Sequence, residues 1–182
     1  MKRLYLTIVC AVLACSNVGA EEISDYRLGP GDYISISVYG EEDLSIKVRI
    51  GSSGSISYPF LGDVAVRGLS AKQLESKLTS GLKGPYLVDP SVTVSMLEYR
   101  PFYVNGEVKR PGSYPFQPGL TVERAISIAG GFTDRASKSK LSVERDSVYL
   151  DIDEKNTRVK RSVKLQDPVM PGDVLSVEQS FF

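Results

Sequence analysis

The sequence contains no histidine and only two cysteines among its 182 residues. The absence of histidine removes the commonest general base and the commonest metal ligand of proteins. Both cysteines, Cys10 and Cys15, lie near the N-terminus, so cleavage after residue 20 leaves a chain without disulfides or cysteine-based metal sites. We therefore predict no catalytic residue, no metal site and no cofactor, although hydrolysis by carboxylates alone stays open.

The chain also lacks a prevailing sign of charge. It has 22 basic and 22 acidic residues, and removal of Lys2 and Arg3 with an N-terminal leader leaves 20 basic against 22 acidic residues, a formal charge of −2. Such a chain has no overall electrostatic attraction for nucleic acid or anionic lipid. Beyond the N-terminal run, no uncharged stretch approaches the roughly 20 residues of a membrane-spanning helix. We expect no nucleic-acid partner.

The first 20 residues have the features of a bacterial signal peptide in the usual order. Two basic residues precede an uncharged run, 4–14, and compact side chains precede Glu21. We predict that residues 1–20 are a signal peptide and that cleavage separates Ala20 from Glu21. A second interpretation stays open, because residues 12–15 resemble a lipobox in which Cys15 becomes a lipidated N-terminal residue.

The remaining chain is predicted to form two short α+β units, each an open mixed sheet with one main helix. In the first unit, Ser70 and Gln73 form a capping-box pattern at the start of a helix whose apolar face includes Leu74 and Leu78. Alternating apolar residues predict its strands at 33–39, 46–50, 56–58, 64–66 and 91–96.

The second unit has the same order of strands, helix and strands. Thr121 is the predicted N-cap of a short helix that ends at Gly130 and Gly131. We expect a hairpin turn around Asp146. The predicted strands are 102–104, 113–116, 141–144, 148–152, 158–164 and 174–177.

Pro-Gly-Asp turns precede the first and the last predicted strands. Proline fixes the φ of the first central residue of such a turn, and glycine accepts the positive φ of the second. The residue types are therefore those that the turns require, which favours an architectural role. These turns are made by Gly29, Pro30, Gly31 and Asp32 and by Pro171, Gly172 and Asp173.

An ordered series of motifs resembles the outer-membrane polysaccharide export family (Wza type). The segment 26–40 resembles the opening of its polysaccharide export domain, and 87–94 continues the match. The segments 104–108, 111–114, 119–122 and 129–133, the last with Gly130 and Gly131, resemble one SLBB domain, a β-grasp module named for soluble-ligand binding. Pro171–Val174 resembles its usual close. The resemblance implies an export domain at 21–99, an SLBB domain at 100–178 and a tail at 179–182.

The resemblance implies a function as well as a fold. Members of this family form ring-shaped homo-oligomers in the periplasm, through which capsular or exopolysaccharide passes towards the cell surface. The resemblance also implies contact with an inner-membrane polysaccharide co-polymerase at the base of the ring. We therefore expect a non-enzymatic component in the periplasm, associated with the outer membrane and anchored there by lipid if Cys15 is the cleavage site.

The sequence departs from the best-known family members at its end. Those carry further SLBB modules and a C-terminal amphipathic helix that forms the outer-membrane pore. Here five residues follow the last predicted strand, about 8 Å as a helix against about 30 Å of hydrocarbon. We expect that this chain makes no pore itself and uses a separate outer-membrane β-barrel as a partner.

Several clusters invite a functional interpretation beside a structural one. Asp151, Asp153 and Glu154 could belong to a metal site or supply the carboxylate pair of a glycosidase, but a shared strand face or a solvated turn is favoured. The basic segments 138–140 and 158–161 could line a channel for an anionic polysaccharide, whereas a solvated loop face is the alternative. The many tyrosines could stack on sugars, although they more often fill half-buried strand edges. The strands at 46–50 and 92–96 are candidates for contacts between ring subunits.

Two further functions compete with export through a ring. One is a soluble periplasmic module that binds a saccharide or small ligand without forming a ring. The other is a polysaccharide-processing enzyme, which the missing histidine and cysteine disfavour.

Overall fold

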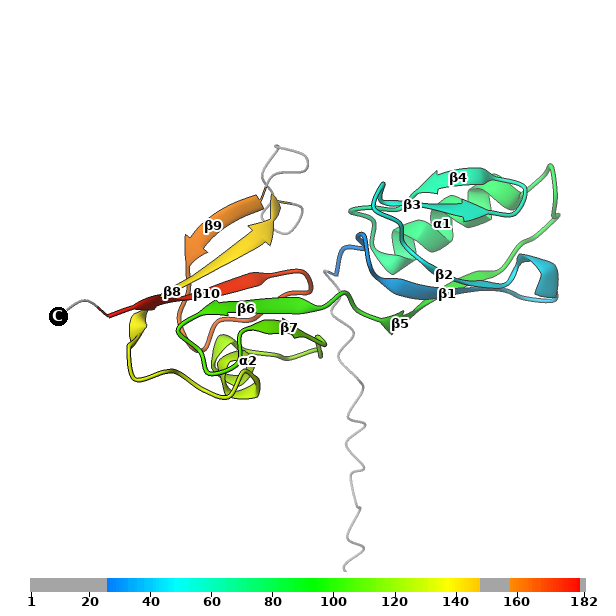
Figure 1. Ribbon diagram of the computed structural model, residues 1–182. Coiled ribbons are helices and arrows are strands. Elements are labelled where there is room, and N and C mark those ends of the chain that lie inside the picture. The colour runs from blue at the N-terminus through cyan, green and yellow to red at the C-terminus, as the bar shows by residue number, and fades with distance from the viewer. Residues whose placement is uncertain (1–25, 148–157, 181–182) are drawn as a thin grey trace, which may run out of the picture.

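The computed structural model describes residues 26–147 and 158–180 (Figure 1). Two separate hydrophobic cores are present, one running from Tyr26 to Val94 and the other from Phe102 to Val177. We call the parts built on these cores the first unit and the second unit. Each contains one α-helix packed on antiparallel or mixed strands, so the predicted α+β class is confirmed.

The first unit is a three-stranded sheet covered on one side by a hairpin and a helix (Figure 1). Its strand order is β2-β1-β5, with both pairs antiparallel, and β3 pairs antiparallel with β4. The elements in chain order are β1 (Tyr33–Val38), the 3-10 helix η1 (Glu42–Leu44), β2 (Ile46–Arg49), β3 (Ser55–Tyr58), β4 (Gly62–Ala65), α1 (Ala71–Leu82) and β5 (Val92–Glu98).

Helix α1 begins and packs as its sequence predicts. The Gln73 N–H donates to the Ser70 hydroxyl at 3.1 Å, and the Ser70 N–H donates to the Gln73 side chain at 2.8 Å, which completes the capping box. Leu74, Leu78 and Leu82 are fully buried against the sheet. The helix ends before Gly84, whose positive φ of 94° does not continue it.

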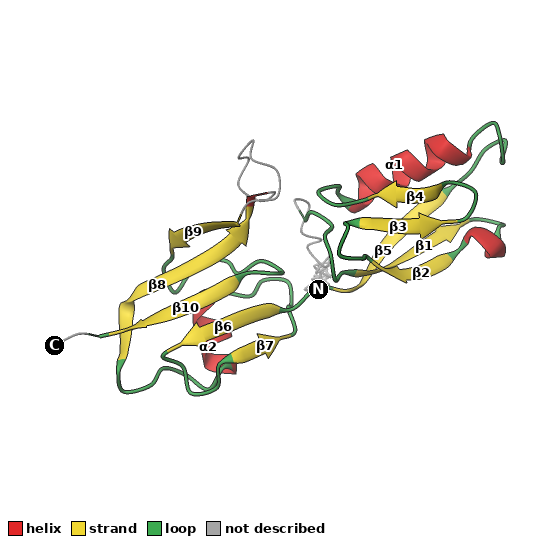
Figure 2. Cartoon of the chain, turned by 45° about the horizontal axis from the view of Figure 1, so that its top comes forward, coloured by secondary structure: helices red, strands yellow, loops and turns green. Residues whose placement is uncertain are grey.

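The second unit is a five-stranded sheet with the order β7-β6-β10-β8-β9. Its first and last strands, β6 and β10, lie parallel at the centre, and the other pairs are antiparallel. This is the β-grasp arrangement, in which a helix covers one face of the sheet (Figure 2). Its elements are β6 (Phe102–Gly106), β7 (Gly112–Tyr114), α2 (Val122–Ile128), β8 (Ala136–Asp146), β9 (Arg158–Ser162) and β10 (Val174–Gln179).

We expected both sheets to be mixed, that is, to combine parallel and antiparallel strand pairs. Among the named strands, only the second unit contains a parallel pair. In the first unit the segment containing α1 returns the chain to the edge of the sheet, where β5 runs antiparallel to β1. In the second unit β10 enters between β6 and β8 and runs parallel to β6. The two units therefore differ in the position of their last strand, which lies at the edge of the first sheet and in the interior of the second.

The predicted turn at Asp146 is wrong. Strand β8 runs from Ala136 through Asp146, which pairs with Arg158 of β9. Leu141 and Val143 are alternate apolar residues, and the charged Arg145 at the next alternate position makes the strand seem to end there. In the structure Arg145 is itself buried, and the strand continues through it. The basic segments 138–140 and 158–161 accordingly lie in strands and not in loops. The predicted strand 148–152 lies outside the described residues.

Candidate functional site

The two Pro-Gly-Asp turns have the same backbone geometry. Gly31 and Gly172 have positive φ angles of 95° and 85°, as the third residue of a type II turn requires. In each turn the aspartate N–H donates to the carbonyl three residues earlier, at 3.2 Å for Asp32 and 3.1 Å for Asp173. The aspartate carboxylate in turn accepts the N–H of that earlier residue at 2.8 Å. Each turn is thereby closed by both backbone and side chain.

Each aspartate is buried and holds an arginine. Asp173 accepts two hydrogen bonds from Arg145, at 2.9 Å from Nε and 2.7 Å from a terminal nitrogen. Asp32 accepts the Arg100 backbone N–H at 2.9 Å and its guanidinium at 3.1 Å, and also the Tyr26 hydroxyl at 2.6 Å. Because the carboxylates are withdrawn from water, these partners are what make their burial tolerable.

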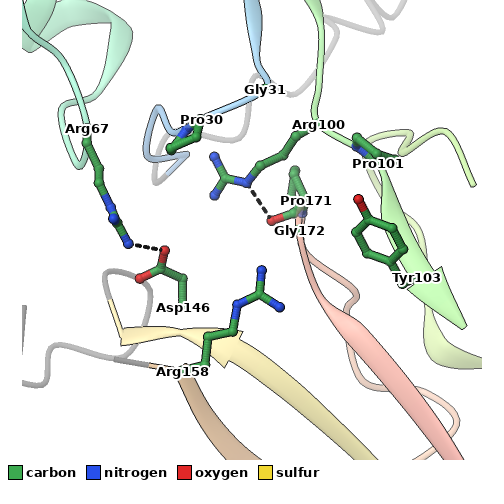
Figure 3. A pocket seen from close by; sticks show the side chains of 10 residues that line it. All are labelled: Pro30, Gly31, Arg67, Arg100, Pro101, Tyr103, Asp146, Arg158, Pro171 and Gly172. Carbon is green, nitrogen blue, oxygen red and sulfur yellow. Dashed lines mark hydrogen bonds and ion pairs between the residues drawn. The ribbon is translucent and has the colours of Figure 1, made fainter. Parts of the chain in front are cut away.

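Arg100 connects the turn of the first unit to the turn of the second. Its Nε donates to the Pro171 carbonyl at 3.1 Å (Figure 3). Its terminal nitrogen donates to the Asp32 carboxylate at 3.1 Å. The Gly172 N–H donates to the Pro101 carbonyl at 3.1 Å beside it. A Cβ at Gly29 or Gly172 would overlap the guanidinium of Arg100. Glycine is therefore needed here for space as well as for backbone conformation.

Aromatic rings and a second ion pair reinforce the same junction. Tyr99 packs edge-on against Tyr26 of the first unit and Phe116 of the second, with ring centroids 5.0 and 5.4 Å apart. Arg67, which follows β4, forms an ion pair of 2.7 Å with Asp146 at the end of β8. The connection between the units thus combines aromatic packing with ionic contacts.

A cavity of about 320 Å³ lies between the units at this junction, and we call it the junction pocket (Figure 3). Among the residues that the structure describes, the side chains of Arg67, Arg100 and Arg158 face it together with the carboxylate of Asp146. Arg67 and Arg100 are engaged by carboxylates or carbonyls. Its other lining residues are Pro30, Gly31, Pro101, Tyr103, Pro171 and Gly172.

The described lining of the junction pocket consists of cations, backbone groups and one ion-paired carboxylate, which suits an anion. Among these described residues, no nucleophile is hydrogen-bonded to a base. Over residues 26–147 and 158–180 no cluster of three or more acidic residues, the donor type available here, is placed to hold a metal ion.

The structure brings together most, but not all, of the residues that the sequence singled out. The two turns meet through Arg100. Gly130 and Gly131 lie elsewhere, with positive φ angles of 86° and 85° at the end of α2, where the Gly131 N–H donates to the Ile126 carbonyl at 2.9 Å. The cleavage residues Ala20 and Glu21, the alternative Cys15 and the acidic group 151–154 lie outside the described residues.

Sequence reasoning missed the arginines. Arg145 occupies a position in β8 that the alternation of Leu141 and Val143 assigns to the core, so a buried ion pair could have been inferred from it. Arg100 carries no such signal, because it stands in a short linker. Its partners Asp32 and Pro171 are 68 and 71 residues away in the chain.

Two family profiles match the chain in the order expected from the motifs. A profile described as polysaccharide biosynthesis/export protein matches residues 20–97, and an SLBB domain profile matches residues 101–160. The chain belongs to the polysaccharide export protein family. The first profile covers the first unit and the second covers the second unit as far as β9, so we refer to the two units as the export domain and the SLBB domain. The junction pocket lies between them.

Three curated relatives carry export or production names. ExoF, an exopolysaccharide production protein of Rhizobium meliloti, is 36% identical over 66% of this chain and 32% of its own length. KpsD, a polysialic acid transport protein of Escherichia coli, is 33% identical over 81% of this chain and 25% of its length. EpsA, an EPS I polysaccharide export outer membrane protein of Ralstonia nicotianae, is 27% identical over 85% of this chain and 47% of its length.

The chain therefore spans between a quarter and a half of the length of these relatives. None of the helices described here is both long enough and apolar enough to cross a bilayer.

Proposed function

We propose that this protein is a non-enzymatic, ring-forming component of a machine that exports capsular or exopolysaccharide across the periplasm. The observation that carries this is the succession of an export domain and an SLBB domain in one chain, shared with relatives named for polysaccharide export or production. The contacts of Arg100 and Tyr99 support it, because they join the two domains at a defined angle.

The ring is supported by the edges of the export domain. Strands β2 and β5, which include the segments expected to make subunit contacts, are the outer strands of the sheet, on opposite sides of β1. Rings above two members need heterologous contacts, in which one surface of a subunit meets a different surface of the next. Two opposite strand edges meet this requirement, since the edge of a sheet can accept a further strand. On β5 a further strand would have to accommodate the Val94 N–H, which donates to Glu75 of α1 at 2.9 Å.

The proposed location is the periplasm, in association with the outer membrane. Its proposed partners are the polysaccharide in transit, an inner-membrane polysaccharide co-polymerase and further copies of the same chain. Mass spectrometry of the N-terminus of the exported protein distinguishes the two modes of attachment. An unmodified Glu21 start excludes a lipid anchor at Cys15, whereas an acylated Cys15 indicates a lipid anchor worth about 0.8 kcal/mol per buried CH₂.

Deletion of the gene tests the export function. Cells without the chain should retain polymer in the periplasm, and the wild-type gene should restore surface polymer. Normal surface polymer in the deletion strain would contradict the proposal.

Light scattering of the purified protein tests the ring, and a monomer that binds saccharide at all concentrations would favour the soluble binding module instead. Polymer shortened by the protein would indicate an enzyme.

A further inference from the structure

One face of the five-stranded sheet carries no helix in the described part of the chain. The apolar residues Val104, Val143 and Leu175 are buried on the face that α2 covers. Alternate residues of the same strands point to the opposite side, because side chains alternate along a strand. Figure 2 shows α2 behind the sheet and the strands β6, β10, β8 and β9 side by side in front of it. We call this second side the open face.

The strand register aligns polar side chains across the open face. Asn105 of β6 lies opposite Ser176 of β10, Ser176 lies opposite Ser142 of β8, and Ser142 lies opposite Ser162 of β9. One amide and three hydroxyls therefore form a continuous row over four strands. Such groups both donate and accept hydrogen bonds, which is the pattern that sugar hydroxyls require.

Ser142 is the unusual member of this row. Its side chain is only 7% exposed, and within residues 26–147 and 158–180 its hydroxyl oxygen has no hydrogen-bond partner. A buried hydroxyl without a partner costs about 1–3 kcal/mol. A ligand hydroxyl bound at this position would supply the missing partner.

Ser142 lines a hollow of about 390 Å³ on the sheet. Small-molecule sites in proteins usually have volumes of about 300–1,000 Å³. Three cations, Lys140, Lys160 and Arg161, line it against one anion, Glu178, which gives the lining a formal charge of +2. The hydroxyls Ser139 and Ser162 complete its polar wall. The hollow thus combines sugar-type hydrogen bonding with attraction for a negative charge.

We propose that this hollow binds an acidic sugar unit, with Lys140 and Lys160 attracting its carboxylate and Ser142 and Ser162 binding its hydroxyls. The inference rests on the proposed export function, because the polymer in transit is the saccharide to which the face is exposed. It adds the chemical class of that polymer: a chain that carries carboxylates. The hollow lies on the SLBB domain alone and is separate from the junction pocket, which shares none of its lining residues.

Calorimetric titration of the purified protein with oligogalacturonate, which has one carboxylate on each sugar, tests the proposal. Binding should weaken as sodium chloride is raised, because exposed charges are screened. A neutral maltooligosaccharide of equal length should bind at least about fivefold more weakly, since each exposed ionic contact is worth up to about 1 kcal/mol. Polyglutamate supplies carboxylates without sugar hydroxyls and should also bind more weakly.

Three variants separate binding from folding. The double variant Lys140→Gln/Lys160→Gln should lose about tenfold in affinity for oligogalacturonate, while Lys164→Gln, an exposed lysine of the same domain outside the hollow, should change nothing. Ser142→Ala should weaken binding without lowering the melting temperature, because the hydroxyl it removes has no partner in the fold. If Ser142 has only a structural role, Ser142→Ala should lower the melting temperature and leave the affinity unchanged.

Equal affinity of the double variant and the wild type would overturn the proposal, as would equal binding of the maltooligosaccharide. Polyglutamate bound as tightly as oligogalacturonate would show a simple polyanion surface and would also contradict it. Export is scored separately in the deletion strain. Restoration of surface polymer by the wild-type gene, combined with unchanged affinity of the variants, would refute the inference and leave the export function intact.

Discussion

Arg100 has more structural consequences than its place in a short linker suggests. Its side chain is 12% exposed, and its partner Asp32 is completely buried. Arg49 and Glu98 form a shorter ion pair, 2.6 Å against 3.1 Å, but their side chains are 53% and 61% exposed. Water cannot replace the partner of Asp32 in the buried pair, whereas water can solvate both side chains of the Arg49–Glu98 pair. Their energetic weights should therefore differ by several kcal/mol.

Replacement of Arg100 by alanine should lower the free energy of unfolding by about 3–5 kcal/mol, because it leaves the Asp32 carboxylate buried with one charge partner removed. Arg49→Ala, the matched control, should cost at most about 1 kcal/mol. Urea denaturation followed by circular dichroism measures both. Equal losses in the two variants would show that the burial of Asp32 does not set the energy of its ion pair.

Tyr58 makes the stability sensitive to alkaline pH. Burial raises the pKa of its hydroxyl above the ordinary value of 10.0, and the hydroxyl donates to the Leu44 carbonyl at 2.8 Å. The protonated form is therefore favoured in the folded state. Its contribution is fully present below pH 10 and is lost as the pH rises through the folded-state pKa, since the unfolded chain releases the proton first.

The variant Tyr58→Phe should accordingly be about 1 kcal/mol less stable than the wild type at neutral pH, because it loses the hydrogen bond to Leu44. The difference between the two proteins should shrink above pH 10. Denaturation at a series of pH values from 7 to 11 measures this difference. A gap that stays constant throughout would contradict the assignment.

At the scale of elements, the local signals of the sequence were sufficient for most of the fold. The capping residues of α1, the glycines after α2 and the alternation in β1 are each determined by neighbours in the chain. What the sequence could not reveal are pairings over long distances. Strand β8 was predicted too short because the partner of Arg145 is Asp173, 28 residues away. Likewise, the meeting of the two Pro-Gly-Asp turns depends on Arg100.

The central pairing of β6 with β10 can be tested at a single glycine. Gly106 and Gly119 have similar positive φ angles, 83° and 77°, so alanine is conformationally unfavourable at both. At Gly106 the added Cβ would also overlap the Val177 carbonyl of β10, whereas at Gly119 it would meet nothing within 4 Å. The two substitutions therefore differ in packing but not in backbone strain.

Gly119→Ala should lower the free energy of unfolding by about 1–2 kcal/mol, because a residue with a side chain is strained in the left-handed conformation. Gly106→Ala should cost more than about 3 kcal/mol or prevent folding, because neither backbone segment can move without breaking the sheet. Chemical denaturation gives the comparison, and soluble yield covers the case in which the variant does not fold. Similar stability of the two variants would argue against close packing of β6 and β10.

At the scale of the whole molecule, the question is whether the two units behave as one body. Domains within a chain are expected to move relative to one another unless their interface is substantial. Here the contacts are few but varied: the rings of Tyr26, Tyr99 and Phe116, the ion pair of Arg67 with Asp146, and the hydrogen bonds of Arg100. In the ring that we propose, this coupling would let the angle between the export and SLBB domains determine the shape of the passage.

Scanning calorimetry of Tyr99→Ala tests this coupling. The wild type should unfold in one transition whose calorimetric and van 't Hoff enthalpies agree. Tyr99 packs against both hydrophobic cores, so its removal should separate the unfolding of the two units into two transitions or one that is clearly broadened. Tyr39→Ala, at a tyrosine that is 90% exposed, should leave the single transition unchanged.

If Tyr99→Ala merely shifts one sharp transition to lower temperature, the remaining contacts of Arg67 and Arg100 are sufficient to hold the units together. In that case the additional substitution Arg67→Ala should produce the separation, because it removes the ion pair with Asp146.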